Sequence, residues 1–291
     1  MVMKRFLCTN SIAALTVGLL VMSWPLQAFP PAPGHTLYGN VRDQYGMLIP
    51  SSGTVVRTFA GSRELAAQPL FDVPSGNYNY QIRVRMDMAR PDTDSYHPEV
   101  LDENSVLNLK VAMGGRTYLP IEMNSPTTVG KPSTRRRLDL TLGVDSDGDG
   151  LPDAWEESQL YQAGVPAGQN GWDLSKLDRD GDHDGDGFSN WHEYLAGTYA
   201  LDATSILDLK IIEKTASSDH LEFYSFYGKV YTLESSADLQ VWTPVSFTLA
   251  PPAAAGASGA AQTSLTATTT GPTSLYVATT DTTLHYRLLA R

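Results

Sequence analysis

Hydrophobic residues alternate with polar residues along three stretches in the first half of the chain. The alternation runs through 78–86, 107–113 and 138–144. A period of two places one side of a β-strand in a core and the other side toward solvent. Glycine and proline separate these stretches, and none of them has a helical period. Residues 29–143 are therefore predicted to form a β-sandwich domain.

The last part of the chain returns to the same kind of pattern. Strands are expected at 207–212, 221–234, 241–249, 275–279 and 284–289, and the Ala/Pro/Gly-rich segment 250–262 is expected to be a long loop. Residues 205–291 are therefore predicted to form a second, smaller β-sandwich. The fold class that follows is mainly β, with two β-sandwich domains joined by a region of different character.

The joining region, residues 144–204, is rich in aspartate, glycine and tryptophan. It contains two short helix candidates. The first covers 152–161, with Pro152 near its first turn and acidic residues at its N-terminal end. The second covers 189–196 and is ended by Gly197.

The first 28 residues are typical of an export signal. Lys4 and Arg5 precede an apolar run at 11–22 that is too short to span a bilayer, and small residues allow cleavage after Ala28. The alternative is an uncleaved membrane anchor. A secreted, cell-surface or periplasmic protein is expected, with no membrane span after cleavage.

Removal of the signal changes the composition of the mature chain. Cys8 is the only cysteine, so disulfides and thiolate zinc sites are excluded from the mature protein. The net charge of −11 becomes −13, because the signal carries two positive charges and no negative ones. So acidic a protein is not expected to bind nucleic acid or anionic membranes.

Two stretches in the joining region match the pattern D-x-D-x-D-G-x5-E, at 145–156 and 182–193. Oxygen ligands at positions 1, 3, 5, 7, 9 and 12 can surround one Ca²⁺, and the glycine at position 6 allows the sharp turn between them. The ligands expected in the first loop are Asp145, Asp147, Asp149, the Leu151 carbonyl, Asp153 and Glu156. Those expected in the second loop are Asp182, Asp184, Asp186, the Phe188 carbonyl, Asn190 and Glu193.

The setting of the loops favours structural sites over a calcium switch. The first loop follows a strand pattern, so the incoming helix of an EF-hand is missing, and Pro152 at position 8 has no N–H for a bridge between paired loops. Asp178 and Asp180 are left over, either to hold a third ion or to share the second. The alternative for the whole region is a solvated acidic linker.

The pair of loops resembles the thrombospondin type-3-like calcium repeats of secreted bacterial proteins, over roughly 145–204. It is also similar to dockerin repeats, which have only an outgoing helix, although Glu156 and Glu193 stand where dockerins usually have aspartate. The pattern Gly39-x-Val41-x-Asp43-x-x-Gly46 resembles carboxypeptidase-regulatory-like β-sandwiches. Residues 231–242 and 285–288 resemble a fibronectin-III-like module. These resemblances imply structural calcium between two β-sandwiches.

Three functions stay open at this point. The first is a non-enzymatic, calcium-stabilised modular protein with a structural, adhesive or partner-binding role, whose partner is a protein or a polysaccharide. The second is a carbohydrate-binding or accessory module of a polysaccharide-degrading system, with Tyr224 and Tyr227 as a platform for sugar rings. The third is a secreted hydrolase with structural calcium, although no nucleophile motif marks one. The basic run 135–137 is interpreted as a solvated strand face, or as a surface that docks on the acidic loops.

Overall fold

The computed structural model describes residues 32–72, 78–87, 99–251, 260–278 and 284–291. The predicted signal peptide and most of the predicted loop 250–262 lie outside these residues. Residues 32–291 belong to one compact unit. Within the described parts of the chain, no helix is long and apolar enough to cross a membrane.

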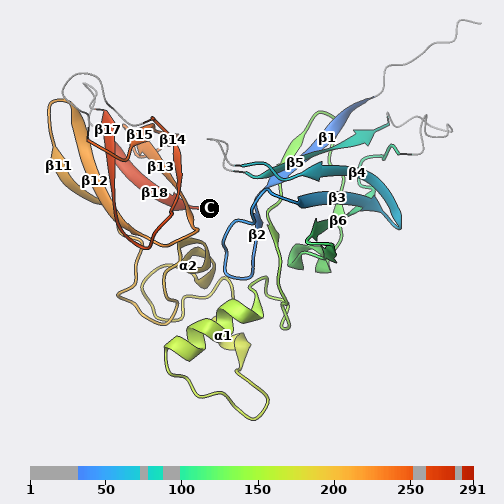
Figure 1. Ribbon diagram of the computed structural model, residues 1–291, viewed down its shortest axis with the longest axis horizontal. Coiled ribbons are helices and arrows are strands. Elements are labelled where there is room, and N and C mark those ends of the chain that lie inside the picture. Colours follow the sequence, from blue (N-terminus) through green and yellow to red (C-terminus); the bar gives the residue numbers. More distant parts are fainter. Residues whose placement is uncertain (1–31, 73–77, 88–98, 252–259, 279–283) are drawn as a thin grey trace, which may run out of the picture. The chain divides into compact units, whose positions relative to one another are not determined.

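Three sheets form the first part of the chain (Figure 1, blue to green). One has the order β5-β1-β9, a second pairs β10 with β2, and a third has the order β4-β3-β6-β7 with β8 beside β6. Their bounds are β1 Ala32–Gly39, β2 Val41–Arg42, β3 Thr54–Ala60, β4 Arg63–Pro69, β5 Tyr80–Met86, β6 Val106–Met113, β7 Arg116–Tyr118, β8 Thr127–Thr128, β9 Arg135–Arg137 and β10 Leu140–Thr141. A 3-10 helix, η1 Ile121–Asn124, lies between β7 and β8.

The core of this part follows from the alternation in the sequence. Every second residue of β5 is buried, and so are Leu107, Leu109 and Val111 of β6. These side chains pack in one hydrophobic cluster with Leu37 of β1 and others. The period-two pattern therefore selects the buried face of each strand as expected.

Two further sheets form the last part of the chain, with the orders β11-β12-β17-β15 and β14-β13-β16, and with β18 paired to β13. Their bounds are β11 Lys210–Lys214, β12 Ser218–Ser225, β13 Val230–Ser236, β14 Thr243–Pro244, β15 Phe247–Thr248, β16 Ser264–Thr266, β17 Gly271–Ala278 and β18 His285–Ala290. Leu221 and Leu275 of one sheet share a hydrophobic cluster with Tyr231 and Leu233 of the other.

The segment between the β regions contains α1 Asp153–Gln162, the 3-10 helix η2 Leu174–Leu177 and α2 Asn190–Ala196. Gly197 ends α2 in the left-handed region, with φ +91°. A third hydrophobic cluster joins these elements through Leu151, Trp155, Leu177 and Tyr194. The two loops and the helices that follow them thus share a single small hydrophobic core.

The predicted mainly β fold is confirmed, and both predicted helices exist within one residue of the expected bounds. Three strand predictions were too long. Only Leu140–Thr141 of the stretch 138–144 is a strand, although backbone bonds from Leu138, Leu140 and Leu142 follow the parallel segment 38–42. The stretch 221–234 is split into β12 and β13 by the turn at Tyr227 and Gly228, and 241–249 is split into β14 and β15. The β-sandwich arrangement and the domain boundaries stay predictions.

Candidate metal centre

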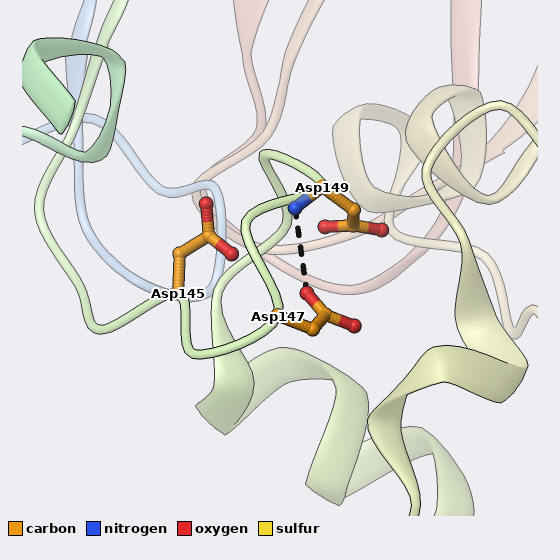
Figure 2. Close-up of side chains that lie close together, drawn as sticks. All are labelled: Asp145, Asp147 and Asp149. Carbon is orange, nitrogen blue, oxygen red and sulfur yellow. Dashed lines mark hydrogen bonds between the residues drawn. The ribbon is translucent and has the colours of Figure 1, made fainter. Parts of the chain in front are cut away.

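The three aspartates at the start of each loop lie together. In the first loop the carboxylate oxygens of Asp145, Asp147 and Asp149 are within 4.8 Å of one another (Figure 2). In the second loop Asp182, Asp184 and Asp186 form an equivalent group within the same distance. Like charges at this separation repel one another, so each group favours a cation.

The first loop has a conformation in which backbone N–H groups hold its aspartates. The carboxylate of Asp145 accepts hydrogen bonds from Gly148 N and Gly150 N, at 2.8 and 3.2 Å. Asp149 N donates to Asp147 Oδ1, the bond drawn in Figure 2, and Asp149 Oδ1 accepts from Leu151 N at 2.7 Å. The φ angle of Gly150 is +99°, which suits glycine at position 6.

The second loop repeats this arrangement bond by bond. Asp182 accepts from Gly185 N and Gly187 N at 2.8 and 3.0 Å, and Asp186 accepts from Phe188 N at 2.7 Å. Gly187 has the same φ of +99°. Two sequences that share their motif positions and a glycine at position 4 therefore adopt one loop geometry.

The glutamate at position 12 of each loop is buried without a matching donor. Glu156 is fully buried, and neither of its carboxylate oxygens has a hydrogen-bond partner. Glu193 is 1% exposed; its Oε2 has no partner, and its Oε1 accepts only a long bond of 3.4 Å from the Thr198 hydroxyl. An unpaired buried carboxylate costs a great deal of free energy, so both positions require a cation or a proton.

The protons on these two glutamates are held abnormally tightly. Burial raises the pKa of Glu156 to about 9, and the carboxylates of Asp147 and Asp149 add to the effect. Burial also raises the pKa of Glu193 to about 8, with a contribution from the carboxylates of Asp184 and Asp186. In a fold without metal both side chains are therefore neutral at pH 7, although a cation would require them as anions.

The two loops differ at position 9. Both oxygens of Asp153 accept hydrogen bonds from Ser146, one from its N–H at 2.7 Å and one from its hydroxyl at 2.6 Å. Asn190 is buried; its amide donates to the Asp178 carbonyl, and its Oδ1 has no partner. Asn190 is thus available as a direct ligand, whereas Asp153 suits the water-mediated contact that is common at this position.

The structure places the other predicted ligands as follows. Leu151 is buried in the small core and Phe188 is 41% exposed, each directly after the position-6 glycine. Asp178 and Asp180 are exposed and belong to neither aspartate group. The Asp178 side chain accepts a bond from Asp180 N, and the Asp178 carbonyl accepts from Gly181 N as well as Asn190.

A direct connection between the loops was not expected from the sequence. Asp149 Oδ2 in the first loop accepts a 2.6 Å bond from the backbone N–H of Arg179, and the Arg179 carbonyl accepts from Trp191 N in α2. The Arg179 guanidinium also lies 4.2 Å from the centre of the Trp191 ring. This link takes the place of the bridge that Pro152 cannot form.

The C-terminal end of α2 contacts both β regions. Lys229, at the start of β13, is buried; its ammonium donates to the carbonyl of Tyr194 in α2 and, at 2.7 Å, to that of Tyr45. The Tyr194 hydroxyl donates to the Asp43 carbonyl at 3.0 Å, and the Tyr231 hydroxyl donates to the Ala196 carbonyl at 2.8 Å. The helix that carries Asn190 and Glu193 is therefore fixed to the turn 43–47 and to β13.

The remaining candidate residues have local partners. The basic run forms β9; Arg137 pairs with Asp139, and Arg135 lies over the Tyr38 ring, so the partners belong to the first β region and not to the loops. Tyr224 and Tyr227 are 50% and 62% exposed on the last β region.

No protein-family model, no curated protein and no solved structure matches this chain. The inference of function therefore depends on the residues and their geometry alone.

Proposed function

We propose that the chain is a secreted, non-enzymatic calcium-binding protein of modular build. Two Ca²⁺ ions, one in each loop, stabilise α1 and α2 and so make rigid the connection between the two β regions. The role would be structural, adhesive or partner-binding. In this proposal the segment 145–204 is related to thrombospondin type-3-like calcium repeats, and the export signal supplies the calcium-rich extracellular setting.

The observation that carries the proposal is the state of Glu156. A fully buried carboxylate with two unpartnered oxygens lies close enough to four aspartates of the same loop for their charges to raise its pKa. Hydrogen bonds within the protein do not compensate for its burial, but a bidentate contact to Ca²⁺ would. Glu193 repeats the situation in the second loop, so chance is a poor explanation.

The donor set favours calcium among the common cations. All candidate ligands are oxygen atoms, so they suit the hard cations and not zinc or copper. Six ligand positions, with a glutamate able to offer both oxygens, match the coordination that Ca²⁺ takes. Mg²⁺ prefers octahedral geometry and keeps several waters, which a loop closed by a buried glutamate does not favour.

Calorimetric titration of the full chain with Ca²⁺ tests the proposal. We expect two ions per chain for the native protein, and one ion for Glu156→Gln. Glu157→Gln is the matched control, because Glu157 is the next residue and is exposed; it should keep both ions. Failure of the native protein to bind Ca²⁺ at millimolar concentration, the range of extracellular modules, would refute the proposal.

A second candidate function is a carbohydrate-binding accessory module. The observation in its favour is the exposure of Tyr224 and Tyr227, since exposed aromatic rings can stack on sugars. A glycan array would test it, with loss of binding in a Tyr224→Ala and Tyr227→Ala double variant as the expected result. Unchanged binding by the double variant would dismiss this platform.

A further inference from the structure

The sheet formed by β4, β3, β6 and β7 has a charge opposite to that of the chain as a whole. Its four strands carry four basic side chains and one acidic side chain, whereas the chain has a net charge of −11. The basic residues are Arg57, Arg63, Lys110 and Arg116, and the acidic residue is Glu64. This sheet is thus net positive in an acidic protein, as is the sheet of β5, β1 and β9 with its five arginines.

Three of these cations line a single groove of about 620 Å³. It lies on the face opposite to the core, because Arg57 of β3 alternates with the buried residues Val56 and Thr58. The lining also includes residues with small or no side chains, among them Gly53, Ala112, Gly115 and Thr117. Arg63 does not line the groove.

The cations are held in place by their neighbours. The ammonium of Lys110 lies 4.9 Å from the centre of the Phe59 ring, and Arg57 Nη1 donates to both oxygens of Glu64 at 3.0 Å. Within the described residues, neither Lys110 nor Arg116 has a carboxylate at ion-pair distance. Arg57 and Lys110 are also direct cross-strand partners of like charge, and Glu64, which lines the groove as well, supplies one carboxylate beside them.

We propose that this groove binds a carboxylated polysaccharide. Its acid groups pair with Lys110, with Arg116 and with the guanidinium nitrogens of Arg57 that do not contact Glu64. The site is separate from the calcium loops, and the proposal goes beyond the calcium function without depending on it. Charge complementarity selects an anionic polymer over a neutral one. A repeating acid suits a groove that presents several cations along an open surface.

The backbone pairing disfavours a peptide added as a new strand. β3 pairs with β4 on one side and β6 on the other, and β6 pairs with β3 on one side and with β7 and β8 on the other. The N–H and C=O groups of β3 and β6 are therefore committed to the sheet, so on these two strands recognition has to come from side chains. Nucleic acid is disfavoured because Lys110 occupies the Phe59 ring on which a base would stack.

Affinity electrophoresis of the full chain in gels that contain polygalacturonate tests the proposal, with calcium present. We expect retardation by polygalacturonate but not by dextran, and weaker retardation at high salt. The Lys110→Glu and Arg116→Glu double variant should bind at least about tenfold more weakly, since it reverses two contacts that are each worth several-fold. Arg63→Glu is the matched control for each single reversal, Lys110→Glu or Arg116→Glu, and should bind as the native protein does, because it reverses one positive charge on the same sheet outside the groove.

Other outcomes of the same experiments would overturn the proposal or leave it standing. An equal loss of polygalacturonate binding in the control variant would assign the binding to overall charge. Loss of binding only in the Tyr224→Ala and Tyr227→Ala double variant would assign it to the tyrosine surface. Either result would overturn the proposal. Retardation by poly-glutamate or by single-stranded DNA, but not by polygalacturonate, would overturn it too. Thermal unfolding of each variant in calcium confirms that it is folded, and a protein that binds polygalacturonate without binding Ca²⁺ would refute only the proposed calcium function.

Discussion

Calcium binding by the full chain at pH 7 is expected to release about two protons. In the fold without metal, Glu156 has a pKa of about 9 and Glu193 a pKa of about 8, because both are buried beside other carboxylates. At pH 7 their carboxyl groups are then about 99% and about 91% protonated, or about 1.9 protons together. A bound cation requires both groups as anions, so these protons leave when calcium enters.

The pH dependence follows from the same two groups. At pH 9 the metal-free glutamates hold only about 0.6 protons together, so the release should fall roughly threefold between pH 7 and pH 9. Glu156→Gln should reduce the release at pH 7 to about one proton, because glutamine has none to give. The exposed Glu157→Gln should leave it at about two.

Isothermal titration calorimetry in buffers of different ionisation enthalpy measures the number of protons directly. The slope of the observed enthalpy against the buffer enthalpy is that number. A release below about half a proton at pH 7 would contradict the burial argument for both glutamates. The same release from Glu156→Gln and Glu157→Gln would show that the protons come from elsewhere.

Four further predictions concern stability and stoichiometry. In EDTA the melting temperature should fall from pH 5 to pH 7, because the metal-free fold holds two protons that the unfolded chain releases above about pH 4.5, and excess calcium should remove this fall; above pH 7 Lys229, whose pKa burial lowers to about 7, opposes it. Gly46→Ala should cost about 1–3 kcal/mol more than Gly53→Ala in denaturant unfolding, since both have positive φ but only the Gly46 Cβ would meet another atom, Lys229 Nζ at 2.5 Å. Tyr194→Phe should cost about 1 kcal/mol in the same assay, because a buried hydroxyl bond is lost, and should leave calcium stoichiometry unchanged. Mutation of both Asp178 and Asp180 to Asn should leave two ions per chain in a calcium titration. A fall from two ions to one would show that these residues share the second ion. Three ions in the native protein and two in the variant would show a third site.

The spacing in the sequence was enough to predict the aspartate groups. Asp145, Asp147 and Asp149 are neighbours along the chain, so a local turn alone brings them together. The same holds for the outgoing helices, whose ends are marked by Pro152 and Gly197. Local chemistry of this kind can be read without knowledge of the fold.

Contacts between distant parts of the chain could not be predicted in this way. The bond from Arg179 to Asp149 spans 30 residues, and that from Lys229 to Tyr45 spans 184. The groove depends on the register that sets Arg57 opposite Lys110, which strand pairing decides and alternation does not. Asp153 shows the limit even within a motif, because the neighbouring Ser146 takes both of its oxygens.

The two aspartate loops differ in what a bound ion would stabilise. The first loop leads into α1, which packs in the small core through Trp155 and Leu160. The second loop leads into α2, whose first turn carries Asn190 and Glu193 and whose last carbonyls accept bonds from Lys229 and Tyr231. A seven-residue helix has little stability of its own, so its order depends on what fixes each end. We infer that an ion in the second loop would have the greater effect on the relation between the β regions, because, of the two α-helices in the described residues, α2 alone is bonded at its C-terminal end to residues of both.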